Sequence, residues 1–227
     1  VRPPAAAGAR QARNSAVAKK AIMSGLLLGY ADPIASLVGP TYLGDDPNLK
    51  PYPYDPAKAK QLLADAGYPN GFSLTLNAYS GQSPKDKEIA QAVAGMLEKV
   101  GVKVNLTIRE WGTFISEYRL HRRSPSYFIS FGLPIWDHSQ AFRSYLTTLS
   151  PASYYRDAEI ERMSRASLTV VDTAQREKLL QQINNRIYND AAFIFLYLGR
   201  TIYGVSKKVQ WEPRTDERVW LYDVSMK

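Results

Sequence analysis

The chain has 227 residues, of which 45% are hydrophobic and 22% charged, a composition typical of a globular protein with one core or two small ones. Its formal net charge of +8 suggests an anionic partner, but no expected element carries a basic stripe with interleaved aromatic residues, which argues against nucleic acid. The absence of cysteine excludes disulfides, thiol catalysis and thiolate metal sites. No stretch is long and apolar enough to cross a bilayer.

The first 53 residues predict a helical start and a long connector. Residues 1–8 contain neither an initiator methionine nor an apolar signal core, so we expect a processed or excised piece. Residues 10–30 show helical spacing of apolar side chains and predict one or two helices. Prolines and glycines interrupt residues 32–53. Within that connector, Asp45 and Asp46 precede a proline and favour a solvated turn over paired catalytic acids.

A helix of about three turns is predicted after Asp55. Asp55 is suited to accept the free amide protons of the first turn, and Pro56 suits the first helical position because no intrahelical partner awaits its missing N–H. Gly67 suits a left-handed stop. The turn Pro69-Asn70-Gly71 then leads into a strand.

A strand–helix–strand unit follows. Alternating apolar residues predict strands from Phe72 to Leu76 and from Val102 to Ile108. Between them, Ser83 is expected to cap a helix that Pro84 begins. Such short joints imply parallel strands with a right-handed crossover, and hence one covered face of the sheet.

The second half of the chain predicts further elements in less regular order. We expect helices over residues 110–120, from 137 to 146, over a segment that opens at 154–163, and from an Asp172–Gln175 capping box to 189. Strands are expected over residues 126–133, 191–198, 201–205 and 219–224. The chain is therefore an α/β protein.

Catalytic motifs are absent from the sequence, which contains no Gly-x-Ser-x-Gly, no phosphate loop and no His-Glu-x-x-His. His121 and His138 lie on different expected elements, and Arg122 and Arg123 beside His121 disfavour a bound cation. We therefore expect neither catalytic residues, nor a metal, nor a cofactor. Two alternatives stay open: a basic nucleic-acid-binding α/β domain, and a hydrolase that uses carboxylates such as Glu110 and Glu117.

The candidate ligand-binding residues are Phe131, Trp136, Asp137 and His138. Phe131 lies near the end of the expected strand that Pro134 stops, and the other three follow that strand. Irregular turns after strand ends place side chains at the rim of α/β sheets, where ligands bind. Two interpretations stay open for Trp136 and Asp137. Trp136 either packs under the loop while Asp137 caps the next helix, or the pair borders a ligand cleft, and the two roles are compatible.

The helix at residues 55–66 carries a specific resemblance. It resembles the signature of the extracytoplasmic solute-binding proteins of ABC importers, in the oligopeptide, dipeptide and nickel class known as family 5. The matching residues are Tyr54-Asp55-Pro56, Ala59-Lys60, Leu62-Leu63, Ala66-Gly67-Tyr68 and Gly71-Phe72. The acidic–Ile–acidic helix start at Glu159-Ile160-Glu161 is similar to the family as well. Residues 10–22 match more loosely, since Ala18 replaces an acidic residue and Arg13 an apolar one.

The resemblance implies a lobe like those of periplasmic binding proteins, with a central mixed sheet and helices on its faces. Residues 1–53 would form an N-terminal helix and connector, 54–205 the second lobe, and 206–227 a returning segment. It implies a substrate-binding component for peptides or a similar small solute, not an enzyme, whose partners are permease subunits and a missing N-terminal lobe. Its location would be periplasmic, or extracytoplasmic and membrane-associated. In peptide-binding members of the family, a Trp is followed by an Asp that pairs with the ligand's amino group. The nearest counterpart in this sequence is Trp136-Asp137.

Overall fold

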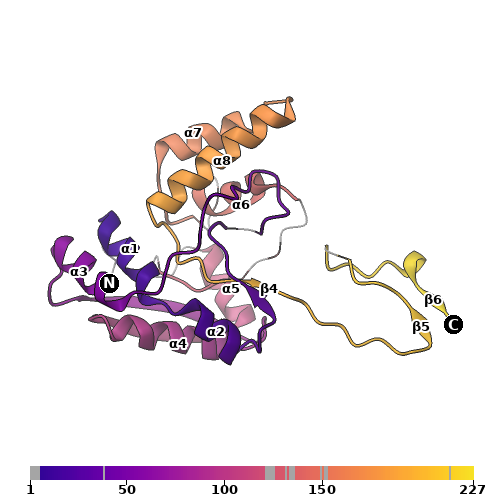
Figure 1. Ribbon diagram of the computed structural model, residues 1–227, viewed down its shortest axis with the longest axis horizontal. Coiled ribbons are helices and arrows are strands. Elements are labelled where there is room, and N and C mark those ends of the chain that lie inside the picture. Colours follow the sequence, from indigo (N-terminus) through magenta and orange to yellow (C-terminus); the bar gives the residue numbers. More distant parts are fainter. Residues whose placement is uncertain are drawn as a thin grey trace.

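The computed structural model describes residues 6–37, 39–120, 126–130, 132, 136–148, 150, 153–214 and 216–227. It consists of a packed body and a long C-terminal arm that leaves the body after β4 (Figure 1). The elements in chain order are α1 (Ala7–Ala16), α2 (Lys19–Gly25), β1 (Ala31–Asp32), α3 (Pro56–Asp65), β2 (Phe72–Ser80), α4 (Asp86–Glu98), β3 (Val102–Glu110), α5 (Trp111–Arg119), α6 (His138–Leu146), α7 (Ala158–Ala166), α8 (Thr173–Asn189), β4 (Leu198–Gly199), β5 (Val209–Gln210), the 3-10 helix η1 (Leu221–Asp223) and β6 (Ser225–Met226).

Helix α3 begins and ends as its sequence predicts. The backbone N–H of Lys58 donates to the Asp55 carboxylate at 2.8 Å, and Pro56 is the first helical residue. Gly67, which follows the helix, has a φ of +87°. Ala59 and Leu63 are fully buried on the inner face. Helix α1 packs against α3, so the N-terminal segment joins the body.

The strand–helix–strand unit forms the centre of the body. β2 and β3 pair in parallel over nine residues each, from Phe72 opposite Val102 to Ser80 opposite Glu110. Helix α4 packs against both strands, as the short joints predict. The start of α4 corrects the prediction at Ser83 and Pro84, because the helix begins at Asp86 and its N-cap, Lys85, makes no side-chain cap hydrogen bond. The carboxylate of Asp86 instead holds the preceding loop by accepting the backbone N–H groups of Gln82 and Ser83 at 3.0 and 3.1 Å.

Several expected strands are wrong in extent. Among residues 126–130 only Tyr127 forms a bridge, parallel to Asn77, and residues 191–205 contain only the two-residue β4, which pairs with β1. Residues 219–224 are not a strand but run into the 3-10 helix η1. A strand needs a neighbour with a free edge, and in the described part of the chain these segments find one over two residues at most. Parallel and antiparallel pairings both occur, in separate two-stranded sheets.

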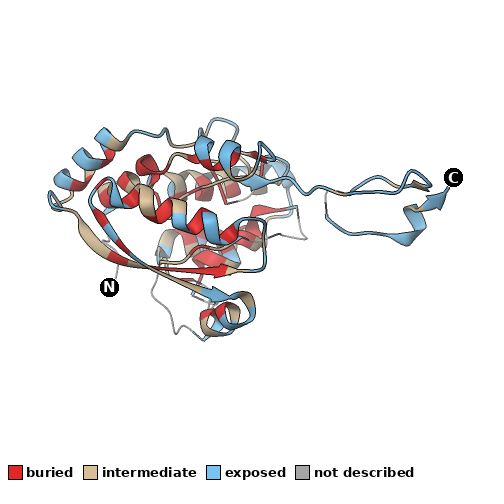
Figure 2. Cartoon of the chain, turned by 90° about the horizontal axis from the view of Figure 1, so that it is seen from below, coloured by how far each residue is buried: buried red, intermediate tan, exposed pale blue. Residues whose placement is uncertain are grey.

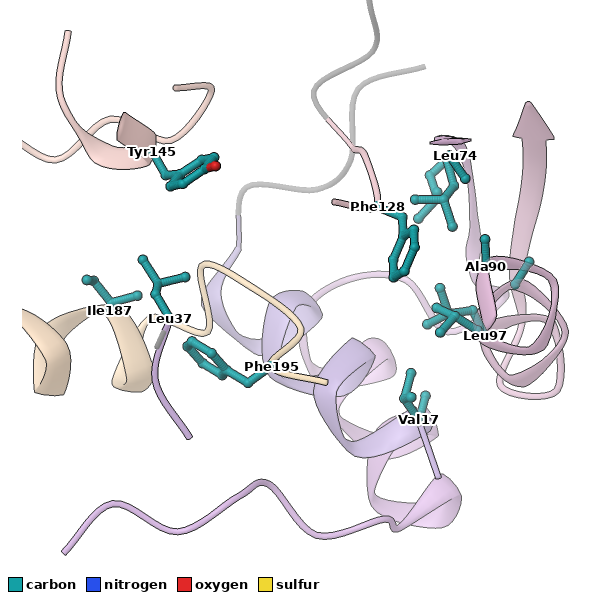
Figure 3. Close-up of a cluster of buried hydrophobic side chains, with 14 of the residues drawn as sticks. Val17, Leu37, Leu74, Ala90, Leu97, Phe128, Tyr145, Ile187 and Phe195 are labelled. Atoms are coloured by element: carbon teal, nitrogen blue, oxygen red, sulfur yellow. The ribbon is translucent and has the colours of Figure 1, made fainter. Parts of the chain in front are cut away.

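The hydrophobic core runs through the body and stops at the arm. Figure 3 shows Leu74, Leu97 and Phe128 at the sheet, and Ile187 and Phe195 where α8 and the following segment pack. In Figure 2 the buried residues concentrate in the body, while the arm, residues 200–214 and 216–227, is exposed along almost its whole length. Within the described residues, no helix has the length and hydrophobicity that a membrane crossing requires.

Candidate functional site

The turn before α6 carries the described candidate residues, Trp136, Asp137 and His138. A single parallel bridge holds this turn against the connector at Leu43. The N–H of Leu43 donates to the carbonyl of Trp136 at 3.0 Å, and the N–H of His138 donates to the carbonyl of Leu43 at 3.2 Å. The connector, which the sequence suggested only as a linker, therefore fixes the backbone of the site.

The carboxylate of Asp137 interacts with other residues of the chain. It is the N-cap of α6, where its carboxylate accepts the N–H of Ser139 at 2.7 Å, and its other oxygen forms an ion pair with Arg176 of α8. Burial alone would raise the pKa of Asp137, but the hydrogen bonds from Ser139 and Arg176 outweigh it and hold that pKa below its usual value. The capping interpretation is confirmed, and both carboxylate oxygens have partners.

His138 is fully buried. Its Nδ1 contacts the side-chain amide of Asn184, and its ring meets Phe142 edge-on. Its Nε2 has no hydrogen-bond partner among the described residues. Burial lowers the pKa of His138 to about 4 against a small opposing effect of Asp137, so the ring is neutral at pH 7. It packs within the fold and does not face solvent.

Trp136 is the described candidate that faces open space, with 38% of its surface exposed. Its ring stacks on Tyr42 with centroids 5.8 Å apart and planes 14° apart. A hollow of about 430 Å³ lies beside it, lined by Trp136, Pro213, Arg214 and Asp216, which we call the Trp136 hollow. One wall therefore comes from the body and the other from the arm.

The charges in the Trp136 hollow are mutually satisfied. Arg214 Nε and Nη2 donate to the two carboxylate oxygens of Asp216 at 3.0 and 2.8 Å. This hydrogen bonding lowers the pKa of Asp216 to about 2. The guanidinium also lies 5.8 Å from the ring centre of Trp220. The hollow thus offers an aromatic face and a fixed ion pair, a combination suited to binding a small polar solute with a planar or apolar part.

The sequence matches a known family over most of its length. The profile described as "Bacterial extracellular solute-binding proteins, family 5 Middle" covers residues 2–153. The chain belongs to family 5 of the bacterial extracellular solute-binding proteins. The resemblance seen at residues 54–72 is therefore confirmed, and so is the expected membership of this family, with its periplasmic-binding-protein fold.

Three relatives illustrate the family 5 match. A glutathione-binding protein, GsiB of Pectobacterium atrosepticum, is 32% identical over 88% of this chain and 40% of its own length. The periplasmic binding protein DppA of Helicobacter pylori, solved with the peptide STSA, has a TM-score of 0.84 at 25% identity over 97% of this chain and 44% of its own. A dipeptide-binding protein of Pseudoalteromonas sp. SM9913, solved with Met-Leu, has a TM-score of 0.83 at 24% identity, over the whole of this chain and 46% of that one. This chain spans about two fifths of the curated relative.

The family 5 fold brings together residues that sequence reasoning could not join. Tyr42 and the arm residues of the hollow lie far from Trp136 in sequence, and no spacing rule connects them. Phe131 and His121 lie outside the described residues, so both remain predictions. Glu110 caps α5 by accepting the N–H of Thr113 at 3.2 Å, and no group of three or more potential metal ligands occurs among the described residues.

Proposed function

We propose that this chain forms the second lobe of a family 5 solute-binding protein, which binds a peptide or a similar small solute and presents it to the permease subunits of an ABC importer. The protein would work in the periplasm, or attached to the outer face of the membrane. The observation that carries this proposal is the Trp136 hollow, because its walls come from two parts of the fold that motion of the arm could open or close.

The arm supports the existence of a first lobe. Its end carries large apolar side chains that are unusually exposed, with Leu221 at 79%, Tyr222 at 95% and Met226 at 72%. Contiguous exposed apolar residues mark surfaces that another body covers. The relatives are more than twice as long as this chain, which leaves room for such a lobe. We infer that the first lobe packs on the arm and encloses the Trp136 hollow.

Trp136 is the residue that we propose to contact the solute. Its aromatic face is exposed, whereas Asp137 caps α6 and His138 is buried beneath the turn. Glutathione and peptides appear in the names of the relatives, and both offer planar amide groups that stack on indole. Phe131 stays a predicted contact.

The test is a binding measurement on the complete two-lobed protein. Glutathione, the dipeptide Met-Leu and the peptide STSA are titrated by calorimetry into the wild type and into Trp136→Ala. We expect at least one solute to bind, and the variant to bind it about 30-fold more weakly, which corresponds to the ~2 kcal/mol of a buried aromatic contact. Val171→Ala, which removes an exposed apolar side chain outside both the hollow and the arm, is the control. Equal affinity of Trp136→Ala and the wild type for the solute would show that Trp136 does not contact it.

A further inference from the structure

One face of α8 carries three side-chain amides that hold the connector. Gln181 Nε2 donates to the carbonyl of Asp45 at 2.9 Å, and Asn184 Nδ2 to the carbonyl of Gly44 at 2.7 Å. Asn185 Nδ2 donates to the carboxylate of Asp46 at 2.7 Å. These three residues, which we call the amide clamp, bind three consecutive connector residues.

The packing leaves the clamped segment little freedom to shift. Gly44 has a φ of +93°, and a Cβ added to it would overlap the side chain of Leu180, which is fully buried one turn before Asn184. The connector backbone therefore lies directly on α8. Its position along the helix is set by the three amides that follow Leu180 on α8.

The same connector segment supports the solute-facing ring from its other end. Tyr42 stacks on Trp136, and Leu43 pairs with the backbone on both sides of Asp137. Leu43 directly precedes the first clamped residue, Gly44, and only one residue separates Leu43 from Asp45, which Gln181 holds. A displacement of the connector along α8 would therefore move the face against which the indole rests.

We propose that Gln181 and Asn185 are positioning residues that set the orientation of the Trp136 ring through the connector. Asn184 belongs to the same clamp, but it also contacts His138 and is buried, so its removal would disturb the core as well. The expected effect of the clamp on solute affinity rests on the proposed function of the Trp136 hollow. The expected effect on the orientation of the Trp136 ring is independent of that function.

The first experiment observes the ring without any solute. The chain is labelled with 5-fluorotryptophan, and its four tryptophan resonances are assigned by substitution, Trp136 through Trp136→Phe. We expect the Trp136 resonance to shift or broaden in Gln181→Ala and in Asn185→Ala. It should stay in place in Gln182→Ala, which removes an exposed glutamine from the adjacent position. An unchanged Trp136 resonance in both clamp variants would overturn the proposal, as would an equal change in Gln182→Ala.

The second experiment measures coupling in the two-lobed protein. Gln181→Ala and Asn185→Ala should each weaken solute binding about 5-fold, the size of one lost neutral hydrogen bond. In the Trp136→Phe background, the same substitutions should cause a clearly smaller loss, because the clamp acts through the indole. Equal losses in both backgrounds would contradict the positioning role. If the wild type binds no solute, the proposed function fails, while the fluorine spectra still decide the clamp.

Discussion

Arg13 places a cation in the interior of α1 without an acidic partner. Arg13 is half-buried: its Nε is buried and has no hydrogen-bond partner among the described residues, none of which forms an ion pair with the guanidinium. Burial, with a smaller effect of Arg10, lowers the pKa of Arg13 to about 10. The site therefore costs folding free energy that an apolar side chain of similar length would not.

Replacing Arg13 by Met should stabilise the protein. We expect the free energy of unfolding to rise by about 1 kcal/mol, because the variant removes a half-buried charge that has no acidic partner among the described residues. Urea unfolding followed by circular dichroism measures the change. Arg10→Met is the control on the same helix and should destabilise, since Arg10 forms an ion pair with Asp190 and donates to its backbone carbonyl at 2.6 Å. A loss of stability in Arg13→Met would show that the guanidinium has a favourable role.

His138 makes stability depend on pH in the mildly acidic range. Its pKa falls from 6.5 to about 4 on folding, so the unfolded chain binds the proton more readily than the native one. The native state therefore loses stability as the pH falls from about 6.5 to about 4, by up to about 3 kcal/mol. Above pH 7 this contribution is fully present.

The pH dependence is measured by urea unfolding between pH 7.5 and about pH 4.5. In His138→Phe the slope over this range should be clearly smaller, because phenylalanine keeps an aromatic ring in the site but binds no proton. His121 contributes equally to both curves. Parallel curves for the wild type and the variant would contradict a buried neutral His138.

At the scale of elements, Gly67 and Gly71 of the signature at residues 54–72 have different structural roles. Gly67 ends α3 at a φ of +87° in open space, whereas Gly71 enters β2 at a φ of +72° directly against Gly101. A Cβ on Gly71 would overlap the carbonyl of Gly101 at the joint between α4 and β3. Gly71 therefore allows the two parallel strands to start side by side.

This difference predicts unequal costs for the same substitution. Gly67→Ala should destabilise by about 1 kcal/mol, the cost of a left-handed alanine. Gly71→Ala adds a backbone overlap and should cost at least about 3 kcal/mol. Thermal unfolding compares the two variants. Similar melting temperatures would mean that the β2–β3 joint adapts more easily than its geometry indicates.

How far the sequence could predict the structure depends on whether a signal is local. Asp55, Pro56 and Gly67 act within one helix, so α3 and its ends were predictable. The expected strands at residues 191–205 could not be verified locally, because pairing depends on a distant edge. The same holds for the site: Asp137 as a helix cap is a local signal, while the stacking of Tyr42 on Trp136 depends on the fold.

At the scale of the whole molecule, a body with a continuous core carries an arm without one. In the described part of the arm, the strand pairing is limited to the two residues each of β5 and β6, yet the arm supplies a wall of the Trp136 hollow. A hollow with so few lining residues encloses little of a solute. The division of the chain at residues 53 and 205 stays a prediction. The proposed solute site at the Trp136 hollow requires a second body to complete it.

That requirement gives the most direct test. Glutathione, Met-Leu and STSA are titrated by calorimetry into this chain and, in parallel, into the two-lobed protein that contains it. We predict no measurable heat of binding for the chain alone at micromolar concentrations, and saturable binding of at least one solute by the two-lobed protein. Micromolar binding of any of these solutes by the chain alone would contradict the account, because the site would then be complete within this one lobe.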